Sequence, residues 1–201
     1  MNKKRIAILG STGSIGIQAL DIIRERPESF SADILTAANN VDELIKQAKE
    51  FLPDMVVIAN DKHFKKVSDE LAGFDIKVFS GMDSIAQVVE HGEIDMVLNA
   101  LVGFAGFEPT IKALKAGKAL ALANKESIVA GGELVTRLIN ENNGYIIPVD
   151  SEHSAIFQCL AGEASNTVEK IYLTASGGPF WNKDMSFVEN AGPGDALRHP
   201  N

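Results

Sequence analysis

The sequence predicts an α/β fold with a doubly wound parallel sheet, and three features support this prediction. Short apolar segments alternate regularly with longer amphipathic segments over residues 1–149. The apolar segments lack polar alternation, which indicates strands that are buried on both faces of the sheet. A glycine-rich turn follows the first apolar segment and leads directly into the first amphipathic one. These patterns together predict strand–helix–strand units, with helices covering both faces of one sheet.

The individual elements follow from hydrophobic periodicity and from residues that break helices. We expect strands at 6–9, 33–37, 55–59, 77–79, 95–99, 119–122 and 145–149. Helices are expected where apolar residues recur every three or four positions, at 15–26, 41–51, 61–71, 82–91, 107–116 and 125–142. Pro53 ends the second of these helices, and Gly117 closes the fifth.

The pattern changes near residue 150, so we predict a Rossmann-type domain over 1–149 and the beginning of an α+β catalytic domain over 150–201. A short helix is expected at 154–160 and a strand at 168–174. The segment from 175 onward is rich in Gly, Pro, Asn and Ser, which is typical of a long functional loop such as a lid. We expect the chain to be truncated within this domain.

Composition excludes several classes of function. The formal net charge is −8, which argues against a nucleic-acid partner. A single cysteine, Cys159, rules out an internal disulfide and fits a reducing compartment; we expect it to be buried in a helix. No apolar segment approaches the roughly 18 residues of a membrane span. A soluble, cytoplasmic protein is therefore expected, with no membrane partner.

The glycine-rich turn, GSTGSIG at 10–16, lies between the first strand and the first helix. Gly10, Gly13 and Gly16 suit a tight turn, close approach of a pyrophosphate to the backbone, and close packing of helix on strand. The spacing is G-x-x-G-x-x-G rather than G-x-G-x-x-G, so a purely structural turn remains an alternative. The order of strand, glycines and helix favours a dinucleotide site at the helix N-terminus.

The end of the second strand bears on the choice of cofactor. NAD-specific sites usually place an acid there, which binds the ribose 2′-hydroxyl. This chain has Ala37-Ala38-Asn39-Asn40 instead, and the first acid, Asp42, falls in the next helix. With no carboxylate to repel a 2′-phosphate, the sequence favours NADPH over NADH.

Two further clusters of polar residues follow strands of the predicted sheet. Asn124, Lys125 and Glu126 begin the helix after the sixth strand. Capping explains Asn124 and Glu126, whereas a cation at a helix N-terminus opposes the helix dipole, so we expect Lys125 to donate to a substrate oxygen. Asp150 and Glu152 follow the seventh strand, and in extended chain their side chains would point the same way and share a divalent cation.

The motifs together resemble the 1-deoxy-D-xylulose 5-phosphate reductoisomerase family. The matching stretches are GSTGSIG at 10–16, ALANKESIV at 121–129, PVDSEHSAIFQ at 148–158, LTASGGPF at 173–180 and ALRHPN at 196–201. The resemblance runs essentially from end to end of the chain.

The resemblance implies specific roles for individual residues. NADPH would be bound by Thr12, Gly13, Ser14, Ile15, Asn39, Asn40, Asn124 and Glu126. The sugar phosphate would contact Lys125, Ser151, Glu152, Ser176 and His199, and Asp150 with Glu152 would hold Mg²⁺, Mn²⁺ or Co²⁺. The implied reaction is rearrangement and reduction of 1-deoxy-D-xylulose 5-phosphate to 2-C-methyl-D-erythritol 4-phosphate, for isoprenoid synthesis by the non-mevalonate pathway, in a homodimer.

Two other interpretations remain open from the sequence. In the first, the chain is a cofactor-binding fragment without turnover. In the second, it is another Rossmann reductase, of the aspartate-semialdehyde or dihydrodipicolinate type. The pair Asp150 and Glu152 argues against the second, because those enzymes need no metal. Family members continue beyond the point that matches Asn201, and the continuation supplies a third carboxylate for the metal.

Overall fold

A computed structural model describes residues 3–163, 165–173 and 178–198. The chain divides into two compact units, Met1–Ser154 and Ala155–Asn201. None of the described helices is both long enough and apolar enough to cross a bilayer.

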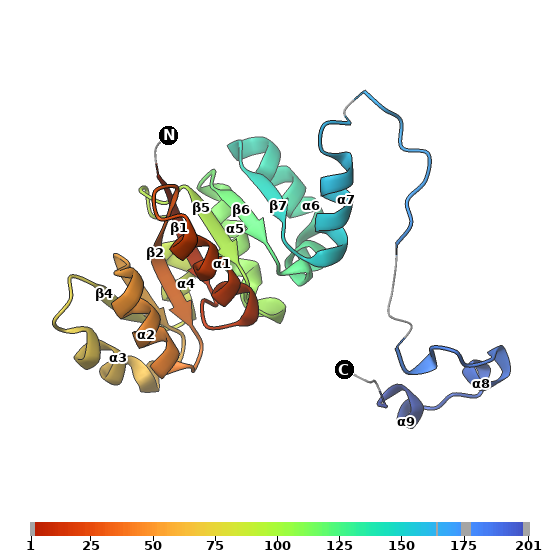
Figure 1. The fold of residues 1–201 in the computed structure, drawn as a ribbon, viewed down its shortest axis with the longest axis horizontal. Coiled ribbons are helices and arrows are strands. Elements are labelled where there is room, and N and C mark those ends of the chain that lie inside the picture. Colours follow the sequence, from red (N-terminus) through yellow and green to blue (C-terminus); the bar gives the residue numbers. More distant parts are fainter. Residues whose placement is uncertain (1–2, 164, 174–177, 199–201) are drawn as a thin grey trace. The chain divides into compact units, whose positions relative to one another are not determined.

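The first unit is built on one parallel sheet, which confirms the predicted fold class (Figure 1). Within the described residues it has seven strands in the order β4-β3-β2-β1-β5-β6-β7. Their bounds are β1 Lys4–Leu9, β2 Phe30–Ala37, β3 Met55–Ile58, β4 Lys77–Ser80, β5 Met96–Asn99, β6 Ala119–Leu122 and β7 Tyr145–Pro148. The chain moves outward from β1 to β4 and then returns to the other side of β1. That reversal creates a switch point between β1 and β5 at the carboxyl edge, where sheets of this kind bind ligands.

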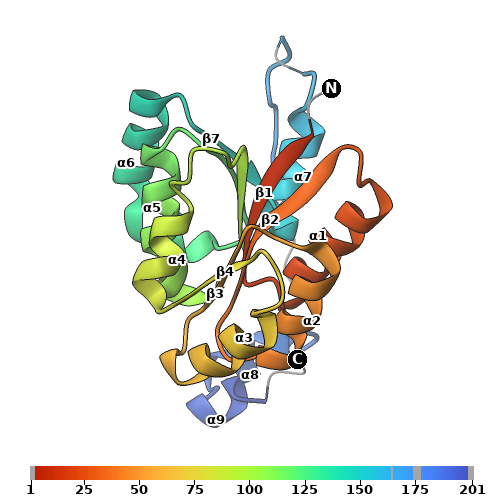
Figure 2. The same ribbon diagram turned by 90° about the vertical axis from the view of Figure 1, so that its left-hand side faces the viewer.

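Helices cover both faces of the sheet (Figure 2). Their bounds are α1 Ser14–Glu25, α2 Val41–Phe51, α3 Phe64–Leu71, α4 Met82–Val88, α5 Phe107–Lys115 and α6 Lys125–Asn142, with short 3₁₀ turns η1 Asp61–His63 and η2 Gly103–Gly106. One apolar core lies under α1, α2 and α3, and the other lies under α4, α5 and α6. The strands between them are buried on both sides, as their uninterrupted apolar sequences predict.

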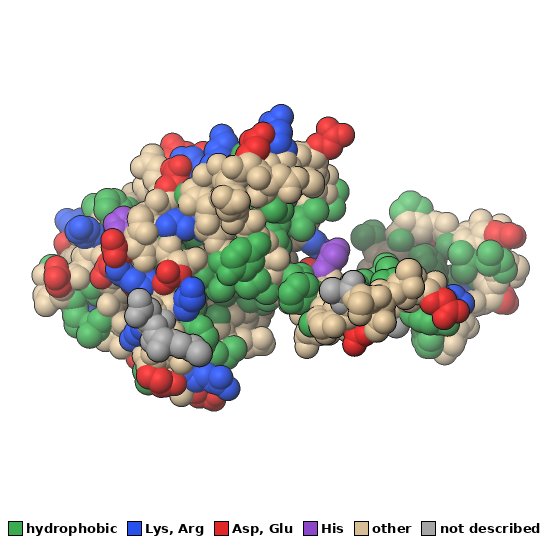
Figure 3. Space-filling view, turned by 90° about the horizontal axis from the view of Figure 1, so that it is seen from above, with side chains coloured by type: hydrophobic (Ala, Val, Ile, Leu, Met, Phe, Trp, Pro, Cys, Tyr) green, Lys and Arg blue, Asp and Glu red, His purple; other side chains and the backbone are tan. Residues whose placement is uncertain are grey.

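The amino-terminal edge of the sheet is held by Arg5, the second residue of β1. Its guanidinium pairs with Asp33, Asp54 and Glu93, which lie on β2 or just before β3 and β5. The hydrogen bond that Arg5 donates to Asp33 is the largest cause that raises the pKa of Arg5 above its ordinary value. Figure 3 views this edge and shows basic and acidic side chains interspersed over the α/β unit. The ion pair with Arg5 explains how Asp33 can lie within β2, which begins at Phe30, three residues before the predicted start.

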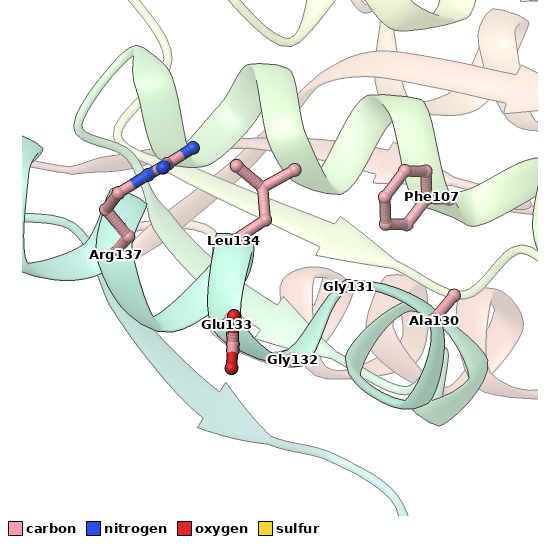
Figure 4. Close-up of a pocket in the computed structure, with 7 residues that line it drawn as sticks. All are labelled: Phe107, Ala130, Gly131, Gly132, Glu133, Leu134 and Arg137. Carbon is pink, nitrogen blue, oxygen red and sulfur yellow. The ribbon is translucent and has the colours of Figure 1, made fainter.

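Helix α6 is interrupted at Gly131, whose φ of −119° and ψ of 15° are not helical. A Cβ atom at this position would lie 2.5 Å from Cε2 of Phe107, so the Phe107 ring occupies the space that any other residue would need. Figure 4 shows Phe107 of α5 facing this break, with Glu133 pointing away from it. The pocket lined here by Phe107, Ala130–Leu134 and Arg137 includes none of the predicted site residues.

The second unit contains the greater part of α7 Ser151–Leu160, then η3 Gly178–Phe180, α8 Met185–Glu189 and α9 Pro193–Ala196. The predicted strand at 168–174 is wrong over its described part, 168–173, because no neighbouring segment pairs with these residues there and a strand requires a hydrogen-bonded partner. Cys159, expected to be buried, is exposed on α7. Phe180 and Phe187 pack with ring centroids 6.4 Å apart.

Candidate functional site

The glycine-rich turn lies at the switch point, and its geometry explains two of its three glycines. Gly10 has a φ of +83°, and a Cβ there would lie 3.1 Å from the carbonyl oxygen of Ala100, in the loop after β5. A Cβ on Gly16 would lie 2.4 Å from the carbonyl oxygen of Gly10 and 2.5 Å from Cα of Ser11. Only glycine permits α1 to pack this closely on the end of β1.

Buried polar contacts hold the turn in place. Ser11 is fully buried, and its backbone N–H donates to the carbonyl oxygen of Thr36 at 2.8 Å. The Ser11 hydroxyl donates to Oε1 of Gln47 at 2.7 Å, and Nε2 of Gln47 donates back to the Ser11 carbonyl at 3.0 Å. Gln47 comes from α2, so this reciprocal pair fixes the turn against the second helix. Sequence reasoning missed Gln47; its position on the apolar face of α2, next to Ala48, was the available signal.

The N-terminus of α1 is open at this turn. Its N-cap, Gly13, offers no side chain, and the first turn, all of it described, carries no acid. Gly13 and Ser14 are exposed, and Thr12 and Ile15 are half-buried. Backbone amides with a partial positive charge therefore face solvent at the end of the central strand, which is an arrangement suited to a phosphate group.

The segment after β2 carries the two predicted asparagines, and both are exposed. Oδ1 of Asn40 caps α2 by accepting from the backbone N–H of Glu43 at 3.4 Å. Oδ1 of Asn39 accepts from Nδ2 of Asn60 at 2.8 Å, and Asn60 follows the neighbouring strand β3. The ends of β2 and β3 are thereby joined beside the glycine turn.

On the other side of the switch point, two buried amides shape the loop between β5 and α5. Asn124 is 1% exposed, and its Nδ2 donates to the carbonyls of Leu101 at 2.7 Å and Gly103 at 2.8 Å. Its Oδ1 accepts from the backbone N–H of Ser127 at 3.0 Å, which caps α6. The amide of Asn124 thus makes its hydrogen bonds within the fold, and it positions the loop as well as the helix.

Asn99, which sequence reasoning did not single out, supports the same loop from inside. Its Nδ2 donates to the carbonyl of Gly106 at 2.8 Å and to Oγ1 of Thr110 at 2.9 Å. The backbone N–H of Leu101 donates to Oδ1 of Asn99 at 3.2 Å. Held in this way, the loop exposes Val102 and Phe104 to solvent at 87% and 73%. A buried amide at the end of an apolar strand was the signal for this role.

Lys125, Asp150 and Glu152 are brought together at the ends of the adjacent strands β6 and β7. Lys125 is exposed at the start of α6, and its charge helps lower the pKa values of both acids. Burial acts to raise the pKa of Asp150, but hydrogen bonds from His153, together with Lys125, lower it overall. A hydrogen bond from the Ser151 hydroxyl is the first cause that lowers the pKa of Glu152. Both side chains are therefore favoured as carboxylates.

Asp150 and Glu152 do not lie side by side in extended chain, so that prediction is wrong. Helix α7 begins at Ser151, three residues before the predicted start, so Glu152 lies in a helical turn. Asp150 caps this turn, since its Oδ1 accepts from the backbone N–H of His153 at 3.2 Å and lies 2.7 Å from Nδ1 of the His153 ring. The described residues include no cluster of three or more histidine, cysteine or acidic side chains arranged to hold a metal ion.

The predicted residues thus fall into two groups at the carboxyl edge of the sheet. The two groups lie on either side of the point where Gly10 approaches Ala100. Thr12–Ile15, Asn39 and Asn40 lie at the ends of β1 and β2, and Asn124–Glu126 and Asp150–Glu152 lie at the ends of β6 and β7. Ser176 and His199 lie outside the described residues, so their predicted roles stay predictions.

Comparison with known families gives a specific result. The family model for 1-deoxy-D-xylulose 5-phosphate reductoisomerase matches residues 6–132, and the model for the C-terminal domain of the same enzyme matches 146–201. The 1-deoxy-D-xylulose 5-phosphate reductoisomerase of Bacteroides thetaiotaomicron is 53% identical over 99% of this chain, and that of Porphyromonas gingivalis is 55% identical over 99%. The chain spans about half the length of these curated relatives, 51% in both cases.

Solved structures give the same picture. The chain superposes with a TM-score of 0.88 and 35% identity on the reductoisomerase of Zymomonas mobilis in complex with NADPH, covering 96% of this chain and 51% of that one. A structure of DOX-P reductoisomerase in complex with NADPH, fosmidomycin and magnesium gives a TM-score of 0.83 at 37% identity, over 98% of this chain and 51% of that one. On the matched family models, the chain belongs to the 1-deoxy-D-xylulose 5-phosphate reductoisomerase family.

Proposed function

We propose that this chain provides the NADPH-binding domain and the beginning of the catalytic domain of a 1-deoxy-D-xylulose 5-phosphate reductoisomerase. The reaction is the metal-assisted rearrangement of the substrate and its reduction to 2-C-methyl-D-erythritol 4-phosphate. The observation that carries this proposal is the uncapped N-terminus of α1 at the switch point, packed on β1 through Gly16. Relatives that share this fold are named as this enzyme, and two solved examples contain NADPH.

The pyrophosphate would bind at residues 12–15, where backbone amides face solvent. The adenosine ribose would lie at Asn39 and Asn40, since the second strand of such folds ends at the ribose. The first acid beyond this point, Asp42, pairs with Lys66 at 2.6 Å, so its charge is compensated. This local balance of charge supports NADPH rather than NADH as the cofactor.

The nicotinamide would extend across the switch point toward the loop after β5. Val102 and Phe104 offer an exposed apolar surface there, and Asn124 keeps the loop in one conformation. Asn124 would thus act by positioning, and Glu126 is exposed in the first turn of α6 beside it. NADPH, when bound, supplies the hydride for the reduction.

The sugar phosphate and a divalent metal would bind at the ends of β6 and β7. Asp150 and Glu152 supply carboxylate oxygens, the donors that Mg²⁺ and Mn²⁺ prefer, but they fill a minority of an octahedral shell. Their lowered pKa values keep both ionised, and Lys125 would donate to a substrate oxygen beside them. A bound metal ion would serve as Lewis acid and template.

A second candidate is a cofactor-binding fragment without turnover, and the half-length match to the relatives favours it for the isolated chain. The two candidates differ in catalysis and not in cofactor binding. Assaying NADPH binding and substrate turnover on one sample of the chain separates them. Cytoplasmic location and a homodimeric assembly stay predictions.

Titration by cofactor fluorescence tests the proposed cofactor site. We expect tighter binding of NADPH than of NADH, and loss of both in Gly13→Val, because the side chain would occupy the pyrophosphate's approach. Gly13 has an extended backbone and its nearest neighbour to a Cβ is 3.4 Å away, so the variant should fold. Gly132→Ala, in open space on α6, is the matched control. Equal affinity for both cofactors would contradict the proposal.

Calorimetry with Mn²⁺ tests the metal site. We expect weak binding by this chain, because two carboxylates leave most of the coordination shell to water. Tight binding that is lost in Asp150→Ala would show instead that two protein ligands suffice.

A further inference from the structure

A 2′-phosphate bound at the end of β2 needs a cation, and the segment Ala37–Asn40 has none. The structure shows what lies beside this segment. Hydrogen bonding between β2 and β3 continues past the strand ends: the N–H of Ala59 donates to the carbonyl of Ala37 at 2.8 Å, and that of Asn60 donates to Ala38 at 3.3 Å. The residues after β3 therefore run alongside those after β2.

We propose that Lys62, in the turn after β3, supplies the cation that recognises the 2′-phosphate of NADPH. The proposal rests on the proposed function, and it assigns the source of cofactor specificity within that site. Two hydrogen bonds link Lys62 to the predicted ribose site. The backbone N–H of Lys62 donates to Oδ1 of Asn60 at 3.2 Å, and Nδ2 of Asn60 donates to Oδ1 of Asn39 at 2.8 Å.

Three other lysines of this region are engaged with acids. Lys66 pairs with Asp42 at 2.6 Å, Lys49 with Glu70 at 2.8 Å and Lys46 with Glu43 at 3.6 Å. The ion pairs found among residues 3–163 include none for Lys62, which is exposed in η1. Its flexible four-carbon side chain can turn toward an anion next to Asn39 without first breaking a salt bridge. Lys65, on α3, forms no ion pair among residues 3–163 either, but it lies further along the chain from Asn60 than Lys62, whose backbone N–H is hydrogen-bonded to the Asn60 side chain.

The local acids make such a cation necessary. Asp61 adjoins Lys62, so a dianionic phosphate at Asn39 meets nearby negative charge, whereas Asp42, in the first turn of α2, is already paired with Lys66. Lys66 thus offsets Asp42, and Lys62, linked through Asn60 to Asn39, is placed to offset the phosphate itself. Because NADH lacks this phosphate, the contact contributes to the binding of NADPH alone.

The experiment compares four ligands with the chain and three variants. Calorimetry or fluorescence titration gives affinities for NADPH, NADH, 2′,5′-ADP and 5′-AMP. In Lys62→Gln we expect binding of NADPH and 2′,5′-ADP to weaken about tenfold, with NADH and 5′-AMP changed less than about twofold. Lys62→Arg should restore most of the loss. Lys77→Gln, at the amino end of β4 on the opposite edge, removes the same charge and should leave all four affinities unchanged.

The possible failures are distinguishable. Equal affinity of the unsubstituted chain for NADPH and NADH would overturn the proposed function and this assignment with it. A preference for NADPH that persists in Lys62→Gln would overturn the assignment alone. A similar loss in Lys62→Gln and Lys77→Gln would also overturn it, because net charge rather than a local contact would then account for the effect.

Discussion

The two units of the chain match the same family along their length but differ in how they are held together. Residues 4–154 surround two apolar cores, in which strand residues such as Ile8 and Leu35 are fully buried. Among the described residues of 155–198 none is buried, and Trp181 and Leu197 are 66% and 84% exposed. The comparison teaches that the helices of the first unit are stabilised by long-range packing, whereas short helices such as α8 and α9 have only local caps and contacts to hold them.

Hydrogen exchange should reveal the largest difference between the two units. Amides of β1, at Ile6–Leu9, should be protected by a factor on the order of 10⁴ or more, because they open only with the whole unit. Amides from 182 to 198 should exchange almost without protection, since α8 and α9 are short and contain no buried residue. Strong protection across 182–198, measured by NMR or mass spectrometry on this chain, would remove the contrast.

Substitution of Gly16 should have the next largest effect. Gly16→Ala places a methyl group against backbone atoms of Gly10 and Ser11, which cannot move away without shifting β1 or α1. We expect a loss of about 3 kcal/mol or more in the free energy of unfolding. Gly13→Ala is the control, because its methyl group has room, and urea denaturation compares the two. Equal stabilities would mean that α1 is packed less tightly than described.

Replacing one asparagine in each unit sharpens the comparison. Asn124→Ala leaves the carbonyls of Leu101 and Gly103 without their donor and should cost about 2–4 kcal/mol. Asn190 also donates to a carbonyl, that of Ser186 at 2.7 Å, but it is exposed and water can replace it. We expect Asn190→Ala to change stability by less than about 0.5 kcal/mol. Comparable losses in thermal denaturation would contradict the difference in burial.

The smallest expected effect is the pH response of α8. Hydrogen bonds from the backbone N–H of Phe187 and then from the Ser186 hydroxyl lower the pKa of Asp184. A lowered folded-state pKa means that the cap is fully effective above the ordinary value near 4 and is lost as the pH falls through the folded pKa. The amide chemical shift of Phe187 should follow this titration while those of β1 stay constant. In Asp184→Asn the shift should become independent of pH.

The sequence predicted the sheet well because apolar strands and glycine breaks are local signals. Helix α6 was predicted with both its ends, from Asn124 as a cap to the Asn143-Gly144 pair beyond its end. The interruption at Gly131 was not, because it depends on the ring of Phe107, 24 positions earlier in the chain. Long-range packing leaves no signature in a single segment.

The positions of the candidate site residues in the fold were predicted in part for the same reason. Residues following strands were located correctly at the carboxyl edge, since parallel strands end together. The roles of Gln47 and Asn99 depend on contacts with Ser11 and with the loop after β5, which sequence spacing does not reveal. The strand expected at 168–174 had suitable residues but needed a partner, and propensity alone did not form it over 168–173.

The central place of β1 bears on the order in which the unit folds during synthesis. β1 emerges first and meets β2 soon afterwards. Its other neighbour, β5, which contains Leu98, is synthesised much later: Arg5 is hydrogen-bonded to Asp95, just before β5, and these two residues are 90 positions apart. At roughly 5–20 residues per second, one side of β1 stays unpaired for several seconds. Ile6–Leu9 is an apolar strand with an open edge in that interval, so the nascent chain is most prone to aggregation before β5 arrives.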